Sequence, residues 1–132
     1  MGDITLTSSD GHTFDVFEAL PKGEAKGGII VLQEIFGVNQ HIREVALGYA
    51  DKGYAAFAPA IFDRVERKIE FGYEDQSEFD RGLDIAFSKL SISDALVDIQ
   101  TTVDALAKFG NVGVVGYCFG GLLTWLSACS VS

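Results

Sequence analysis

The sequence has 132 residues, of which 48% are hydrophobic, and its mean hydropathy of +0.22 indicates one domain with a sizeable buried core. The formal net charge of −9 argues against a nucleic-acid partner, because such partners require basic surfaces. The sequence has no apolar run of the roughly 18 residues that a membrane span requires, and its N-terminus does not have the pattern of a secretory signal. We therefore expect residues 1–132 to belong to a single cytoplasmic domain with neither a nucleic-acid nor a membrane partner.

The chain contains two cysteines, Cys118 and Cys129, which are too few for a disulfide framework. If both lie on one helix, the rise between them is roughly 16 Å. A disulfide requires Cα atoms within about 7 Å of each other, so the two thiols cannot pair within the chain. Reduced thiols are typical of the cytosol.

The first half of the sequence predicts three strands, a helix and a fourth strand. Two short strands at 4–6 and 13–19 form a hairpin, and the continuous apolar run 28–32 predicts a strand buried on both faces. Asn39 is placed to cap a helix that Gly53 ends, and the next strand covers 54–58. A strand, a helix and a second strand in this order predict parallel pairing with a right-handed crossover.

The second half predicts a charged surface segment, two helices, a strand and a final helix. Segment 60–73 is expected at the surface, with its cationic residues solvated: Arg64, Arg67 and Lys68. Helix 74–90 is expected to turn one apolar face to the core, formed by Phe79, Leu83, Ala86, Phe87 and Leu90. Ser91 and Asp94 have capping-box form before a second helix, and a strand at 111–115 precedes a helix at 119–128. The predicted class is α/β with a mostly parallel sheet.

The strand-to-helix segment Gly116–Gly120 has the form glycine, any residue, nucleophile, any residue, glycine, with cysteine where serine is more usual. In this motif, which is called a nucleophile elbow, the small flanking residues allow a sharp turn and close packing. The N-terminus of the following helix favours a thiolate at Cys118. The motif predicts nucleophilic catalysis by this cysteine.

Three motifs occur together in an order that resembles the dienelactone hydrolase family, and the resemblance spans essentially the whole chain. The motifs are Gln33–Asn39 followed by Arg43 and Glu44, then Lys52–Ala56, and then Gly116–Gly121. The resemblance implies an α/β-hydrolase fold that hydrolyses an enol-lactone, such as carboxymethylenebutenolide, or a related ester through a cysteine acyl-enzyme. It implies no cofactor, and the sequence shows no histidine and cysteine cluster with metal-ligand spacing.

The same resemblance implies roles for five residues. Cys118 matches the nucleophile, and Glu34 matches the carboxylate that takes the thiol proton once substrate is bound. The backbone N–H groups of Ile35 and Phe119 match the oxyanion hole. Arg81 lies about where the family has an arginine for the substrate carboxylate, although no motif surrounds it.

The chain departs from the family after the nucleophile, where the triad Asp and then His are expected. Only fourteen residues follow Cys118, and the two histidines, His12 and His41, precede it. The strands that would flank the last strand are also missing, which leaves an open apolar sheet edge. We therefore expect the chain to be the N-terminal part of a longer hydrolase domain, incomplete at its C-terminal side.

Each site residue also has a purely structural interpretation. Cys118 and Cys129 could be small core residues, Glu34 a surface ion-pair partner and Arg81 an ordinary helix-surface arginine. Tyr117 could line the site or simply pack. His41 could replace the missing base, although it opens the first crossover helix.

Two other classes of function are compatible with the sequence. The chain could be a truncated, non-catalytic α/β module that pairs its open edge with a second copy or with a missing segment. It could also be a thiol redox protein in which Cys118 cycles with an external thiol. The reactivity of Cys118 and the oligomeric state of the chain distinguish these alternatives.

Overall fold

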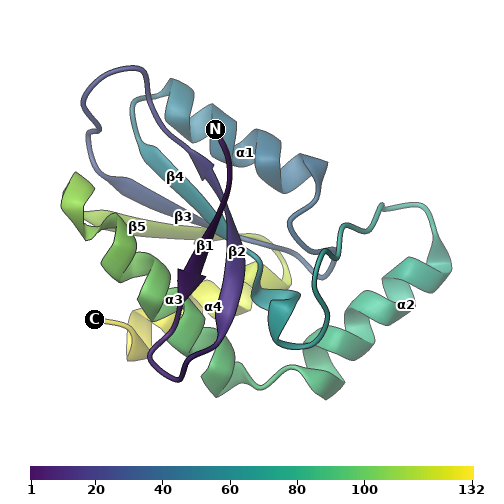
Figure 1. The fold of residues 1–132 in the computed structure, drawn as a ribbon. Coiled ribbons are helices and arrows are strands. Elements are labelled where there is room, and N and C mark those ends of the chain that lie inside the picture. The colour runs from purple at the N-terminus through teal and green to yellow at the C-terminus, as the bar shows by residue number, and fades with distance from the viewer.

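A computed structural model describes all 132 residues, which form a five-stranded mixed sheet with helices on both faces (Figure 1). The order of the strands across the sheet is β1-β2-β4-β3-β5, and β3 runs parallel to both β4 and β5. β1 pairs with β2, and β2 with β4, in antiparallel fashion. The strands are β1 (Gly2–Thr7), β2 (Thr13–Ala19), β3 (Gly28–Leu32), β4 (Ala55–Pro59) and β5 (Val112–Gly116).

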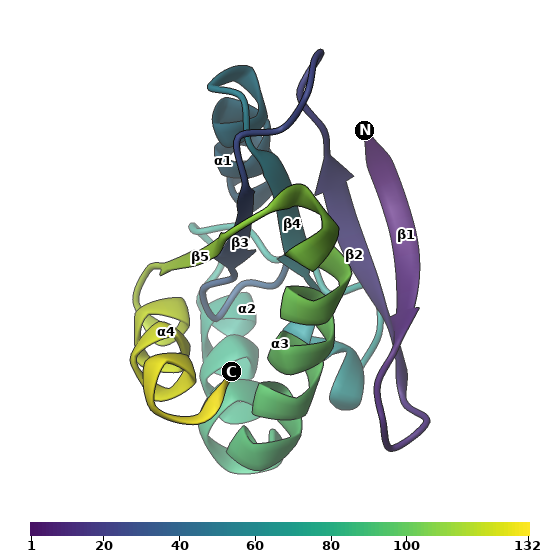
Figure 2. The same cartoon turned by 90° about the vertical axis from the view of Figure 1, so that its left-hand side faces the viewer.

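The helices form layers on the two faces of the sheet. The four α-helices are α1 (Gln40–Asp51), α2 (Gln76–Asp84), α3 (Ile92–Leu106) and α4 (Phe119–Ser130). α1 packs on one face, α3 and α4 pack on the other, and β1 and β5 form the two opposite edges (Figure 2). Short helical turns complete the chain: η1 (Ile61–Arg64) and η3 (Ala107–Phe109) are 3-10 turns, and η2 (Ile85–Lys89) is a π turn. No helix combines the length and apolar character needed to cross a membrane.

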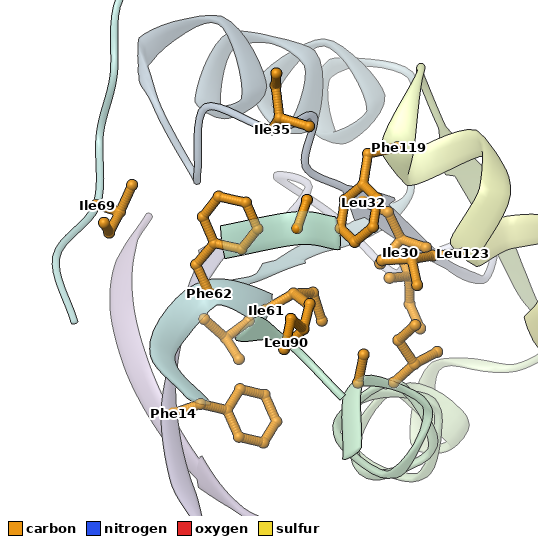
Figure 3. Packing of buried hydrophobic residues seen from close by; sticks show 14 of the residues in the cluster. Phe14, Ile30, Leu32, Ile35, Ile61, Phe62, Ile69, Leu90, Phe119 and Leu123 are labelled. Atoms are coloured by element: carbon orange, nitrogen blue, oxygen red, sulfur yellow. The ribbon is translucent and has the colours of Figure 1, made fainter. Parts of the chain in front are cut away.

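Alternation along the central strands separates two apolar cores. Ile30, Leu32 and Phe57 point to the face covered by α3 and α4, whereas Val31 and Ala56 point to α1. Figure 3 shows the larger core, in which Phe119 and Leu123 of α4 lie with Leu32 and Ile35 of the β3 end (Figure 3). The last residues of β3 and the first turn of α4 therefore share one packed core.

The predicted order of the strands and helices is confirmed, with boundary shifts of one or two residues at most elements. The helix caps are also confirmed: Asn39 accepts a hydrogen bond from the N–H of Ile42 at 3.2 Å, and Ser91 accepts one from the N–H of Asp94 at 3.3 Å. The predicted parallel pairing and α/β class hold as well.

The prediction that segment 60–73 is a solvated surface segment is wrong for its first part, and also for Ile69 and Phe71, which are buried. Ile61, Phe62 and Asp63 are buried, and the side chain of Arg64 is only 12% exposed. The cause is Asp98 on α3, which has no solvent exposure and requires a cationic partner. The Arg64 guanidinium reaches it with hydrogen bonds of 2.9 Å and 2.7 Å.

This buried ion pair also holds the first hairpin against α3. Ser8 donates a hydrogen bond to Asp98 at 2.6 Å, and the Arg64 guanidinium donates another to Asp10 at 2.7 Å. The Nε2 atom of His12 lies 3.8 Å from Asp98. Hydrogen bonding to Asp98 raises the pKa of Arg64 above its ordinary value, so this arginine stays charged. One buried carboxylate thus joins three segments that are distant in the sequence.

The predicted core-facing side of helix 74–90 is also partly wrong. Ala86 and Leu90 are buried, but Phe79, Leu83 and Phe87 are 39%, 36% and 62% exposed. The segment does not keep 3.6 residues per helical turn throughout, because α2 ends at Asp84 and the π turn η2 follows it. The extra residue in that turn rotates the apolar side chains away from a single face.

We predict that Arg64→Met destabilises the chain by about 3 kcal/mol, because it leaves the Asp98 carboxylate buried without its cation. The matched control is Lys89→Met, which breaks the exposed Lys89–Asp84 pair and is expected to cost less than about 1 kcal/mol. Urea unfolding followed by circular dichroism measures both changes. Equal unfolding midpoints for the two variants would show that the Asp98 network does not stabilise the fold.

Candidate functional site

The predicted nucleophile and carboxylate follow two adjacent parallel strands. β3 and β5 pair in a register that places Leu32 opposite Gly116, the last residue of each strand. Glu34 and Cys118 each lie two residues beyond that pair. Because parallel strands end at the same edge of a sheet, the pairing brings these two loops to the same place, where open α/β sheets bind ligands.

Cys118 occupies a sharp turn between β5 and α4, and its backbone is strained. Its φ of 53° and ψ of −117° lie in a region that residues other than glycine rarely adopt. The residue is exposed and immediately precedes α4, a helix of 12 residues. Cys118 therefore lies at the positive end of the helix dipole.

Two glycines make this turn sterically feasible. A Cβ atom on Gly116 would lie 2.1 Å from the carbonyl oxygen of Gly120, and one on Gly120 would lie 2.6 Å from the carbonyl oxygens of both Leu32 and Gln33. Real Cβ atoms do not approach an oxygen so closely. The first turn of α4 consequently packs directly on the backbone at the end of β3, which fixes Cys118 relative to the loop that carries Glu34.

Glu34 lies in a short turn whose backbone is tied on both sides. Its carbonyl oxygen accepts a hydrogen bond of 3.0 Å from Gln33, whose side-chain oxygen in turn accepts one from the N–H of Phe62 at 3.3 Å. The turn closes with a bridge between Glu34 and Gly37, and Gly37 forms a second bridge with Glu70. The Glu34 side chain is half-buried, so its carboxylate is both held and accessible.

Tyr73 contacts the Glu34 carboxylate directly. Its hydroxyl group donates a hydrogen bond of 2.6 Å to Oε1 of Glu34 and accepts one of 3.2 Å from the side-chain amide of Asn39. Partial burial, and then the hydrogen bond to Glu34, raise the pKa of Tyr73 to about 12, and negative charge on Glu34 and Cys118 acts in the same direction. The phenol therefore remains protonated, as a donor, at neutral pH.

Ile35 and Phe119, whose N–H groups are the predicted oxyanion donors, are both anchored in the larger core. Their side chains are 7% and 3% exposed and belong to the same apolar cluster (Figure 3). A Cβ atom on Gly82 would lie 2.2 Å from the carbonyl oxygen of Ile35, so α2 packs on this peptide group. Both backbone segments are held by close packing, as preorganised donors require.

Arg81 forms an ion pair with Glu66 and has no hydrogen bond to Glu34 or Cys118. Its guanidinium binds both carboxylate oxygens of Glu66, at 2.9 Å and 3.0 Å, and lies 5.1 Å from the centre of the Phe71 ring. The pair is about half exposed. A role in binding a substrate carboxylate would require Arg81 to exchange Glu66 for the substrate, and it stays a prediction.

The remaining candidate groups divide between the site and the rest of the fold. The His41 ring lies 6.5 Å from that of Tyr117 and 6.2 Å from that of Tyr73, at the same edge as Cys118. His12 belongs to the Asp98 network, and Cys129 is exposed and unpaired on α4.

No group of three or more His, Cys, Asp and Glu side chains is arranged to hold a metal ion. Cys118 is exposed and Glu34 is half-buried, and neither residue lines a cavity.

Sequence reasoning missed Tyr73 and the packing role of Gly82. Tyr73 lies 39 positions after Glu34 in a segment without a motif, and no periodicity or spacing could have joined the two. Gly82 lies inside a helix, where a glycine usually only weakens the helix. Its position on α2, packed on the peptide of Ile35, is the only signal, and that contact is tertiary.

Comparisons with known proteins show the family to which the chain is similar. Residues 14–132 match the model of the dienelactone hydrolase family. The chain is similar to the carboxymethylenebutenolidase of Pseudomonas putida, with 33% identity over 128 residues, which cover 95% of this chain and 54% of that protein. A Synechocystis sp. protein, provisionally named as a carboxymethylenebutenolidase, is 40% identical over 106 residues, covering 76% of this chain and 42% of its own length.

A solved structure extends the similarity to the fold. A crystal structure from Klebsiella pneumoniae subsp. pneumoniae MGH 78578, provisionally described as a dienelactone hydrolase, superposes with a TM-score of 0.72 at 30% sequence identity. The match covers 98% of this chain and 56% of that one. The chain therefore spans about half the length of the curated relatives that it matches.

We predict that Gly120→Ala destabilises the chain by about 1–3 kcal/mol, because the new methyl group collides with two backbone oxygens of the β3 end. Gly121→Ala is the matched control in the same helical turn, since a Cβ atom there meets nothing closer than 3.6 Å. Urea unfolding of both variants measures the difference. An unchanged stability for Gly120→Ala would contradict the close packing of α4 on β3.

Proposed function

The chain belongs to the dienelactone hydrolase family, and we propose that it carries the nucleophilic half of a site that hydrolyses an enol-lactone or a related ester. The observation that supports the proposal is the register of β3 with β5, because both strands end at the same edge, two residues before Glu34 and before the strained Cys118. The names of the relatives support carboxymethylenebutenolide as a substrate. The proposal includes no cofactor or metal, and it includes the cytoplasmic location expected from the reduced cysteines.

The proposed reaction begins with proton transfer from the thiol. The S–H bond of Cys118 breaks, the proton passes to the Glu34 carboxylate, and the electron pair stays on sulfur. The thiolate then attacks the carbonyl carbon of the lactone or ester, and the C–O bond to the leaving oxygen breaks with its electron pair on oxygen. This gives an acyl-enzyme and an enolate or alkoxide, which takes up one proton; loss of the proton that Glu34 accepted balances this and restores the carboxylate. Water hydrolyses this intermediate in a second step and regenerates the thiol.

The N–H groups of Phe119 and Ile35 are the proposed donors to the oxyanion of the tetrahedral intermediate. Phe119 directly follows the nucleophile, and Ile35 lies in the loop after β3, which are the two positions the general hydrolase pattern uses. Loss of one such donor typically costs about 2.7–4 kcal/mol of transition-state stabilisation. Arg81 is the proposed, weaker contact for a substrate carboxylate, which would displace Glu66.

Within residues 1–132, no histidine is paired with a carboxylate at the elbow. His12 lies beside Asp98 in the network that joins the first hairpin to α3, and the His41 ring lies near those of Tyr73 and Tyr117 with no carboxylate bound to it. The leaving enolate and the hydrolytic water both require a group that exchanges protons near neutral pH. We propose that this group is supplied from outside these residues, with His41 as the internal alternative.

We predict that the purified chain reacts with p-nitrophenyl acetate in a single burst of at most one equivalent of p-nitrophenolate, followed by little or no turnover. Absorbance at 400 nm measures the burst, and mass spectrometry locates the acetyl group on Cys118. Cys118→Ala abolishes the burst, whereas Cys129→Ser, which removes the other exposed thiol, preserves it. Steady turnover that Cys118→Ala removes would show that the proton-exchanging group lies within the chain.

A second function, that of a non-catalytic module that pairs through its sheet edge, is favoured by one surface. β5 pairs only with β3, and α4 beside it exposes Trp125 and Leu122 to 72% and 42%. Exposed apolar surface next to an unpaired strand favours association with another chain. The proposed partner is a second copy of the chain or a further segment of the hydrolase domain.

We predict that sedimentation velocity at micromolar concentrations detects a dimer of the chain, and that Trp125→Lys shifts it to monomer by placing a charge on this surface. Leu20→Lys, at an exposed residue (45%) outside α4 and β5, is the control and keeps the dimer. A chain that stays monomeric at all concentrations would contradict pairing between copies.

A further inference from the structure

A chain of hydrogen bonds leads from the start of α1 to the Glu34 carboxylate. The side-chain oxygen of Asn39 accepts a hydrogen bond from the N–H of Ile42 as the helix cap. The side-chain nitrogen of Asn39 is therefore free to donate, and it donates to the carbonyl oxygen of Phe71 at 3.0 Å and to the hydroxyl oxygen of Tyr73 at 3.2 Å. A hydroxyl that accepts from Asn39 directs its own hydrogen elsewhere, and here it reaches Oε1 of Glu34 at 2.6 Å. Since Asn39 is only 6% exposed, its orientation is fixed by the fold.

The Tyr73 side chain is 51% exposed, and its ring packs against two aromatic neighbours. Its centre lies 4.6 Å from that of Phe36 in an edge-to-face contact, and the His41 ring approaches from 6.2 Å. The preceding segment is pinned to the Glu34 turn, because the N–H of Phe71 donates to the carbonyl of Phe36 at 2.8 Å. Backbone and side-chain hydrogen bonds therefore both join the Tyr73 segment to the turn that carries Glu34.

Tyr73 also lies close enough to Cys118 to respond to its charge. A thiolate at Cys118 raises the pKa of the phenol, as does the carboxylate of Glu34. Both groups that the proposed reaction uses therefore act on one tyrosine. The hydroxyl occupies Oε1 of Glu34, and no hydrogen bond engages Oε2.

We propose that Tyr73 is a positioning residue for Glu34: its hydroxyl group holds one carboxylate oxygen, Oε1, so that the other, Oε2, accepts the proton of the Cys118 thiol. This rests on the proposed function. In that step the S–H bond breaks, an O–H bond forms at Oε2, and the electron pair stays on sulfur. Tyr73 keeps its own proton throughout and does not touch the reacting atoms.

The test is a double-mutant cycle on the acylation burst, in a Cys129→Ser background so that Cys118 is the only thiol. The burst rate with p-nitrophenyl acetate is measured by stopped flow for Tyr73→Phe, Glu34→Gln and the double variant. We expect Tyr73→Phe to slow the burst about tenfold through misplacement of the base, and Glu34→Gln about a hundredfold through loss of the base. The double variant is expected to be no slower than Glu34→Gln alone, because Tyr73 acts only through Glu34.

The matched control is Tyr49→Phe, which removes a hydroxyl group from α1, where Tyr49 contacts Lys52 and not the site. Its burst rate is expected to equal that of the parent. A burst rate that Tyr73→Phe leaves unchanged would overturn the proposal. So would additive losses, about a thousandfold in the double variant, because they would show that Tyr73 acts independently of Glu34.

A second measurement separates failure of this inference from failure of the proposed function. Alkylation of Cys118 by iodoacetamide requires the thiolate but no acyl transfer. If no Cys118-dependent burst occurs, ester hydrolysis fails as a function, and the same cycle is read from the alkylation rates at pH 7. Non-additive losses there still support Tyr73 as the positioning residue of Glu34, whereas additive losses or none overturn it.

Discussion

The parallel pairing of β3 with β5 is the constraint on which the candidate site depends. The hydrogen bonds of this ladder set Leu32 opposite Gly116, and both strands end there. A slip of one residue would turn every side chain of β5 to the other face, exchange the residues that face α3 and α4, and carry Cys118 away from Glu34. The position of Cys118 is therefore set by backbone pairing and by the alternation of the two cores.

Close packing then converts this pairing into a rigid site. The first turn of α4 contacts the backbone of β3 through Gly120, and Phe119 secures the same turn in the apolar core. The strained backbone of Cys118, which costs about 1–3 kcal/mol, persists because the packing on both sides leaves no alternative. Strain at the thiol and burial next to it are thus two parts of one arrangement.

Segment 60–73, which follows β4, connects the Asp98 ion pair with the turn that carries Glu34. Ile61 and Phe62 enter the core, and Arg64 binds the buried Asp98, so the start of this segment is fixed against α3. Its far end returns to the Glu34 turn through the bridge of Gly37 with Glu70. A segment that is held at both ends can deliver Tyr73 to the Glu34 carboxylate without secondary structure of its own.

The sequence by itself determined the order of the elements, the caps at Asn39 and Ser91, and the elbow motif around Cys118. These features are local: they follow from hydrophobic period, capping side chains and glycine spacing within a few residues. Only the tertiary structure decided that the Arg64 side chain is mostly covered, that Phe79 and Phe87 are exposed, and that the Tyr73 hydroxyl group binds Glu34. Each of those outcomes depends on a partner tens of residues away or on a change of helical period. A buried carboxylate requires a cationic partner, and a turn requires a packing partner. Because the fold can supply either partner from a distant part of the chain, a local sequence pattern does not identify it.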